Sequence, residues 1–88
     1  MPDTKILPAM HVKIYAPIST YFDGPANSVS ATNDTGPFDI LPRHKNFMCL
    51  LKPGNITVRR ADQKDFSMRV NQAVMHVKSD KVTVFLDV

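Results

Sequence analysis

Turn residues interrupt this chain so often that no helix of ordinary length fits between them. Proline cannot continue a helix or donate to a sheet ladder, and such breaks recur roughly every 8–12 residues, the spacing typical of a β-sandwich or barrel. No window of eleven or more residues shows a 3.6-residue period. The sequence therefore predicts an all-β fold. The turn signals fall at Pro17 and Pro42 and within residues 23–25, 33–37, 52–55, 61–64 and 78–81.

Between these turns, apolar and polar side chains alternate with the period of a half-buried strand. Val12 and Ile14, for example, alternate with Lys13 and Tyr15. The segment 47–51 is instead nearly continuous in apolar residues, which is typical of a strand covered on both faces. In the last strand, either alternate set of side chains can face inward. The predicted strands are 10–16, 18–22, 28–32, 47–51, 56–59, 66–70, 74–77 and 82–88.

The loop at residues 33–47 is the most sharply defined connection in the sequence. It opens on Asn-Asp-Thr-Gly-Pro, in which Asn and Asp bond to their own backbone and Gly36 permits a positive φ. Pro42 ends the short apolar run that follows. Two further turns are expected, at 23–25 and at 53–54, where Pro-Gly fits the middle of a type II turn.

The length of 88 residues predicts one domain at 10–88, preceded by a loose lead-in at 1–9. The single cysteine, Cys49, cannot form an intramolecular disulfide, which suits a reducing compartment. No apolar run reaches the roughly 18 residues of a membrane span, so we expect a soluble chain without lipid insertion. The net charge of +3 permits an acidic partner without requiring one.

No constellation of catalytic or metal-binding residues is apparent. His44 has Asp39 and Cys49 five residues away on either side, a spacing that does not suit a metal site. We therefore predict no catalytic residue, no metal and no cofactor. His44 is expected to brace the loop after Pro42 or to lie in an interface, and Cys49 to be a small apolar core residue. A hydrolase using His44 is the least favoured alternative.

A second function class remains open from the residues alone. Tyr15, Tyr21 and Phe22, together with the basic residues, could form a stacking and charge platform on a small β-barrel that binds single-stranded nucleic acid. Such binding would weaken steeply with salt because it releases counterions.

The order of several motifs nevertheless points to a known family. A first strand is followed by Phe22-Asp23-Gly24, and then by Gly-x-Phe-x-Ile-Leu-Pro-x-His at 36–44. Leu-Lys-Pro-Gly follows at 51–54, and the chain closes on Val-Thr-Val at 82–84. From about Val12 to Val88 the sequence resembles the N-terminal β-sandwich domain of the ε subunit of F-type ATP synthases, called δ in mitochondria.

The resemblance implies a two-sheet antiparallel β-sandwich of about ten short strands. It implies a non-catalytic subunit of the central rotor stalk of a proton- or sodium-driven ATP synthase, binding the γ subunit and the c-ring and not nucleic acid. By position, the ring-facing loop would be Asn33, Asp34, Thr35, Gly36, Pro37 and Phe38, and the γ-facing positions Ala16, His44 and Cys49.

The sequence departs from the family pattern at three places, and the resemblance covers only part of the family's length. Arg43 stands where a glycine is usual, Lys45-Asn46 where Ala-Pro is usual, and Pro37 where relatives often carry an acidic or polar residue. The resemblance stops before the family's C-terminal helical hairpin, so ATP binding and inhibition of hydrolysis are not expected of these residues. The implied location is the cytoplasmic face of a bacterial inner membrane, or the matrix or stromal equivalent. A surface that γ normally covers can also pair with itself when the chain is isolated.

Overall fold

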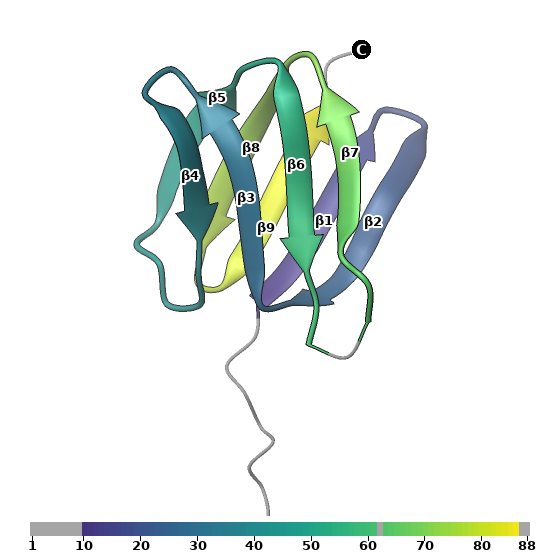
Figure 1. Cartoon of the computed structure of the whole chain (residues 1–88), viewed down its shortest axis with the longest axis vertical. Coiled ribbons are helices and arrows are strands. Elements are labelled where there is room, and N and C mark those ends of the chain that lie inside the picture. The colour runs from purple at the N-terminus through teal and green to yellow at the C-terminus, as the bar shows by residue number, and fades with distance from the viewer. Residues whose placement is uncertain (1–9, 62, 87–88) are drawn as a thin grey trace, which may run out of the picture.

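The computed structural model describes residues 10–61 and 63–86, which form nine strands (Figure 1). The predicted lead-in at 1–9 lies outside these residues. Within them, no helix is long and apolar enough to cross a membrane. The strands are β1 (Met10–Ala16), β2 (Ser19–Ala26), β3 (Ser28–Asn33), β4 (Gly36–Ile40), β5 (Phe47–Leu51), β6 (Gly54–Arg59), β7 (Phe66–Val70), β8 (Ala73–Lys78) and β9 (Lys81–Leu86).

These strands form two sheets packed face to face (Figure 1). One sheet has five strands in the order β2-β1-β9-β8-β5, and the other has four in the order β4-β3-β6-β7. The predicted two-sheet β-sandwich is confirmed. Every pair is antiparallel except β1 with β9, which run parallel at the centre of the five-stranded sheet.

The core is made by the alternate side chains that the strands turn inward. In β1 these are Met10, Val12, Ile14 and Ala16, all at most 5% exposed. In β9 the inward set is Val82, Val84 and Leu86, which resolves the alternative left open by the sequence. No polar or charged residue among those described is buried. Burial of aliphatic surface is therefore the main stabilising contribution.

A pair of phenylalanines closes each open side of the sandwich. Phe22 of β2 lies 5.2 Å from Phe66 of β7, centroid to centroid. On the other side, Phe38 of β4 lies 6.2 Å from Phe47 of β5 in an edge-to-face arrangement. All four side chains are half-buried and pack against the core. Each pair thus joins the edge strands of two different sheets and keeps water from the core.

Two predicted turns take a different form. Residues 23–25 lie within β2, and the chain crosses to the other sheet at Asn27, whose N–H donates to the carbonyl of Arg59 at 2.7 Å. Pro25 is tolerated there because β2 is an edge strand, where a missing N–H breaks no ladder bond. Gly54 begins β6 without a positive φ, so 53–54 is not a type II turn. A Cβ at Gly54 would meet Thr32 Oγ1 at 3.4 Å, which is ordinary van der Waals contact.

Substitution of two isoleucines should affect the stability of the fold very differently. Ile14 is fully buried, whereas Ile18 in the β1–β2 turn is 95% exposed. We expect Ile14→Ala to lower the free energy of unfolding by about 3 kcal/mol, through lost burial and the cavity left behind. Ile18→Ala should change it by less than about 0.5 kcal/mol. Urea unfolding of both variants checks this, and equal losses would contradict the assignment of the core.

Candidate interaction surfaces

The predicted loop at 33–47 contains a strand, β4, that the sequence did not predict. The predicted ring-facing residues lie at the hairpin between β3 and β4. Asn33 shapes it, because its Oδ1 accepts from the Thr35 N–H at 2.9 Å and from the Thr35 hydroxyl at 2.7 Å. Gly36 follows at φ 114°, a conformation that side chains rarely adopt. The hairpin therefore holds one defined shape without a core of its own, as the Asn-Asp-Thr-Gly-Pro sequence predicts.

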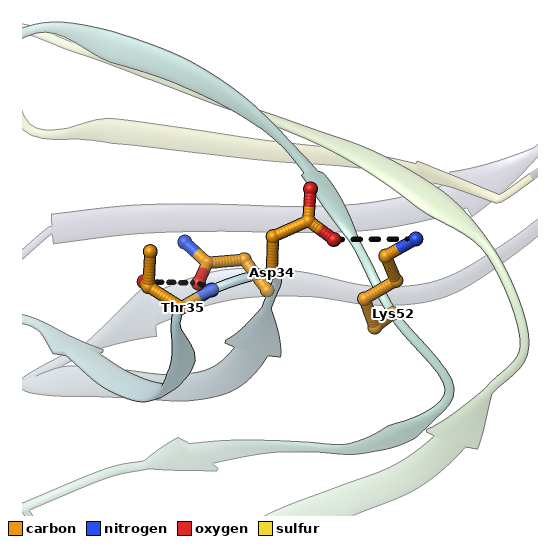
Figure 2. A network of polar contacts seen from close by, with 4 residues as sticks. Asp34, Thr35 and Lys52 are labelled. Carbon is orange, nitrogen blue, oxygen red and sulfur yellow. Dashed lines mark hydrogen bonds and ion pairs between the residues drawn. The ribbon is translucent and has the colours of Figure 1, made fainter.

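The hairpin is also tied to the connection between β5 and β6. Lys52 Nζ lies 3.2 Å from Asp34 Oδ1 (Figure 2). The Lys52 N–H also donates to the Thr32 carbonyl at 2.9 Å. Both charged side chains are more than half exposed, so the ion pair contributes under about 1 kcal/mol. The backbone hydrogen bond is therefore the stronger of the two contacts. It connects the hairpin to the segment that joins β5 of one sheet to β6 of the other.

The six predicted ring-facing residues do not all point the same way. Asp34, Thr35 and Pro37 are exposed, whereas Asn33 and Gly36 are half-buried. The Phe38 ring faces inward, because Phe38 pairs with buried Ala31 in the register and packs on Phe47. Three side chains therefore remain for a direct contact, and Phe38 shapes the loop from beneath.

The three predicted γ-facing positions do not form a cluster. Ala16 ends β1 with its side chain in the core, and β9 and β8 separate β1 from β5, which carries Cys49. Cys49 also faces inward, next to buried Met75 in the register. Partial burial raises the pKa of the Cys49 thiol, and a hydrogen bond from Asn33 opposes the rise.

His44 does brace its loop, as expected. Its N–H donates to the Leu41 carbonyl at 3.1 Å, its Nδ1 lies 2.8 Å from the Lys45 carbonyl, and its ring lies 5.0 Å from that of Phe47. The side chain remains exposed. Within residues 10–61 and 63–86, no three His, Cys, Asp or Glu side chains come close enough to hold a metal.

The aromatic platform considered for nucleic acid is not brought together. Tyr15 lies on the outer face of the five-stranded sheet, where it packs edge-to-face on Phe85 at 5.2 Å. Phe22 turns inward to Phe66 and is covered by the Arg60 guanidinium at 5.5 Å. Phe22 and Tyr15 therefore serve opposite faces of the five-stranded sheet and cannot stack bases together. Tyr21, the third residue of the predicted platform, is 45% exposed.

The structure reveals a surface that the sequence did not predict. The register aligns Tyr15, Phe85, Val74 and Leu50 across β1, β9, β8 and β5, all on the outer face of the five-stranded sheet. We call these four residues the apolar row. Leu50 is 62% exposed, and Met48 beside it on β5 is 64% exposed. The prediction that the segment 47–51 is covered on both faces is wrong for these residues, because β5 is an edge strand whose outer side chains are exposed. Its continuous apolar sequence was nevertheless the signal for this surface.

The hairpin geometry predicts a specific sensitivity at Gly36. Gly36→Ala places a side chain at φ 114° and should cost about 1–3 kcal/mol of stability. Gly24→Ala is the matched control, because its Cβ would meet only Phe22 Cζ at 4.0 Å and its φ is ordinary. We expect the control to stay within about 1 kcal/mol of the parent in urea unfolding. If Gly36→Ala left the free energy of unfolding unchanged, the turn would not be held in this conformation.

Comparison with known proteins agrees with this architecture. The sequence model described as "ATP synthase, Delta/Epsilon chain, beta-sandwich domain" matches residues 9–88. Similar curated proteins include the ATP synthase epsilon chain of a Nitratiruptor species, 30% identical over 78 residues that make up 89% of this chain and 60% of the relative. That of Hydrogenovibrio crunogenus is 34% identical over 79 residues, 90% of this chain and 54% of the relative. The chain thus spans little more than half the length of these relatives.

Solved structures show the same fold at low sequence identity. A chain of the Euglena gracilis mitochondrial ATP synthase complex of OSCP, F1 and c-ring superposes with a TM-score of 0.83 at 16% identity, covering 97% of this chain and 54% of its own. A chain of the Tetrahymena thermophila mitochondrial ATP synthase central stalk and c-ring gives a TM-score of 0.72 at 17% identity, covering 88% and 62%. These likenesses concern the fold.

Proposed function

The chain belongs to the family of the ATP synthase delta/epsilon chain β-sandwich domain, and from this membership we propose that it is a non-catalytic rotor subunit of an F-type ATP synthase. In this role it binds the γ subunit and the c-ring, and it helps to couple a flow of protons or sodium ions to ATP synthesis. The observation that carries the proposal is the family match over residues 9–88, nearly the whole chain.

A rotor part must transmit torque without deforming, and the sandwich suits that task. Its interior is filled by aliphatic side chains from both sheets, with no buried polar group among the described residues. Close-packed interiors have low compressibility. The phenylalanine pairs also link the two sheets along both open sides, so the layers resist sliding past each other.

We place the γ contact on the outer face of the five-stranded sheet and on its β5 edge. Met48 and Leu50 project outward on either side of Cys49 in sequence, and exposed His44 precedes the same strand. Ala16 would contribute through the end of β1, next to Tyr15 of the apolar row. Large exposed apolar side chains that form a continuous row are typical of a surface covered by a partner.

We place the ring contact at the hairpin of residues 33–38. Asp34, Thr35 and Pro37 supply exposed side chains, and the bonds of Asn33 and Lys52 fix their arrangement. Short polar loops of a ring would meet a rigid polar turn with little ordering cost. The subunit would then lie on the cytoplasmic face of a bacterial inner membrane, or on the matrix or stromal equivalent, without entering lipid.

The γ contact can be tested with a charge on the apolar row. Leu50→Lys should lower affinity for the γ subunit from the same source at least about tenfold, because an ammonium group would be buried in an apolar contact. The fold should survive, since the side chain is 62% exposed. Ser67→Lys on the four-stranded sheet is the control, and surface plasmon resonance the measurement. If both variants bound γ with equal affinity, this face would be excluded as the γ contact.

The ring contact has its own test. Pro37→Arg adds a bulky charge at an exposed position of the hairpin without removing a hydrogen bond donor. We expect it to reduce co-purification with the detergent-solubilised c-ring several-fold, while binding to isolated γ is unchanged. Ser67→Arg should behave as the parent. Normal assembly of Pro37→Arg would refute the placement of the hairpin at the ring.

A further inference from the structure

The outer face of the five-stranded sheet carries a second feature, separate from the apolar row. A shallow hollow of about 370 Å³ lies where β8 and β9 join. Three of its lining side chains are basic and two carry hydroxyl groups. The register pairs Lys78 directly with Lys81 across the hairpin, and His76 with Thr83. The lining residues are His76, Lys78, Ser79, Lys81 and Thr83.

The strand register brings the basic residues of this hollow close together. Lys81 faces Lys78 on one side and His11 on the other, in the parallel pair of β1 and β9. Like charges directly opposite one another destabilise a sheet. Among the ion pairs that the described residues form, none includes Lys78 or Lys81. The hairpin thus carries an electrostatic cost that no contact in this part of the chain offsets.

Two acidic residues on this part of the sheet make other contacts. The carboxylate of Asp80, in the hairpin turn itself, accepts the Arg43 N–H at 2.6 Å. Asp23, on the same face of the sheet, pairs with His11 Nε2. Asp80 is thus directed to the Arg43 backbone and Asp23 to His11, and neither side chain lines the hollow.

The hairpin that carries these side chains has a fixed geometry. Ser79 and Asp80 have φ values of 49° and 62°, as in the two-residue type I′ turn that matches strand twist. The Ser79 N–H donates to Asn46 Oδ1 at 3.0 Å, which anchors the turn to the loop before β5. Together with the Arg43–Asp80 bond, this contact holds the turn from outside the hollow. The lysines and hydroxyls are thus presented from a rigid support.

We propose that this hollow binds a phosphate-bearing anion. Two ammonium groups, an imidazole and two hydroxyls offer several donors to the oxygens of one phosphate or diphosphate group, and lysine is a regular phosphate binder. The volume also admits a substituent beyond the phosphate. The same chemistry would recognise a soluble phosphate ester or the headgroup of an anionic lipid. The inference rests on these residues alone and is independent of the rotor assignment.

Titration of the 88-residue chain with pyrophosphate, at constant ionic strength near 150 mM and followed by amide chemical shifts, tests the proposal. We expect saturable shifts confined to residues of the β8–β9 hairpin and the facing part of β1. The double variant Lys78→Gln/Lys81→Gln should bind at least about tenfold more weakly, because charge-assisted bonds are lost. The variant alone should be at least as stable as the parent, since a repulsion is removed.

The control variant Lys64→Gln/Arg69→Gln removes the same charge from outside the hollow, Arg69 lying on β7 of the other sheet. It should bind pyrophosphate as the parent does. Equal weakening in both variants, or shifts that never saturate, would overturn the proposal. Flotation with vesicles of neutral lipid, with and without phosphatidic acid, separates the two sources of phosphate. If the chain binds pyrophosphate through the hairpin lysines but does not float with either kind of vesicle, the ligand is a soluble phosphate ester. If it also floats with the vesicles that contain phosphatidic acid, and the double variant does not, the ligand is a lipid headgroup.

Discussion

The structure depends above all on burial of alternate aliphatic side chains between two sheets. Each strand is short and could not stay ordered alone, since an isolated hairpin is marginal in water. Interdigitation of residues such as Ile14, Ile56 and Met75, all fully buried, gives the layers a common interior. None of the described polar or charged residues is buried in that interior, so these side chains lie at the turns, the edges and the outer faces. The functional surfaces follow from this division.

The two outer faces are used unequally. On the five-stranded sheet the apolar row runs across four strands, and the basic hollow lies beside it near the β8–β9 turn. Leaving Leu50 and Phe85 in water and placing Lys78 opposite Lys81 both cost stability. A fold that carries both costs on one face is expected to gain from what binds there. In the rotor assignment this gain comes from γ on the apolar row, and in our further proposal from a phosphate group in the hollow.

The sequence predicted those features that depend on neighbours in the chain. Alternation identified the strands other than β4, which was placed within the loop at 33–47. Turn chemistry identified the turn at the start of that loop, and ordered motifs identified the family. Prediction from the sequence failed for features that depend on where a strand lies in its sheet. Pro25 reads as part of a turn, yet an edge strand tolerates it. The inward direction of Phe38 and Ala16 follows from the register, and the apolar row requires the parallel pairing of β1 with β9, which joins residues some seventy positions apart.

The most direct test of the central claim is calorimetric titration of the chain with the γ subunit from the same source, at two temperatures and two salt concentrations. We expect one-to-one binding with a negative heat-capacity change and little dependence on salt, the signature of an apolar interface. Absence of binding to γ, with steeply salt-dependent binding to single-stranded nucleic acid in its place, would contradict it. The shared fold would then report ancestry without the rotor function.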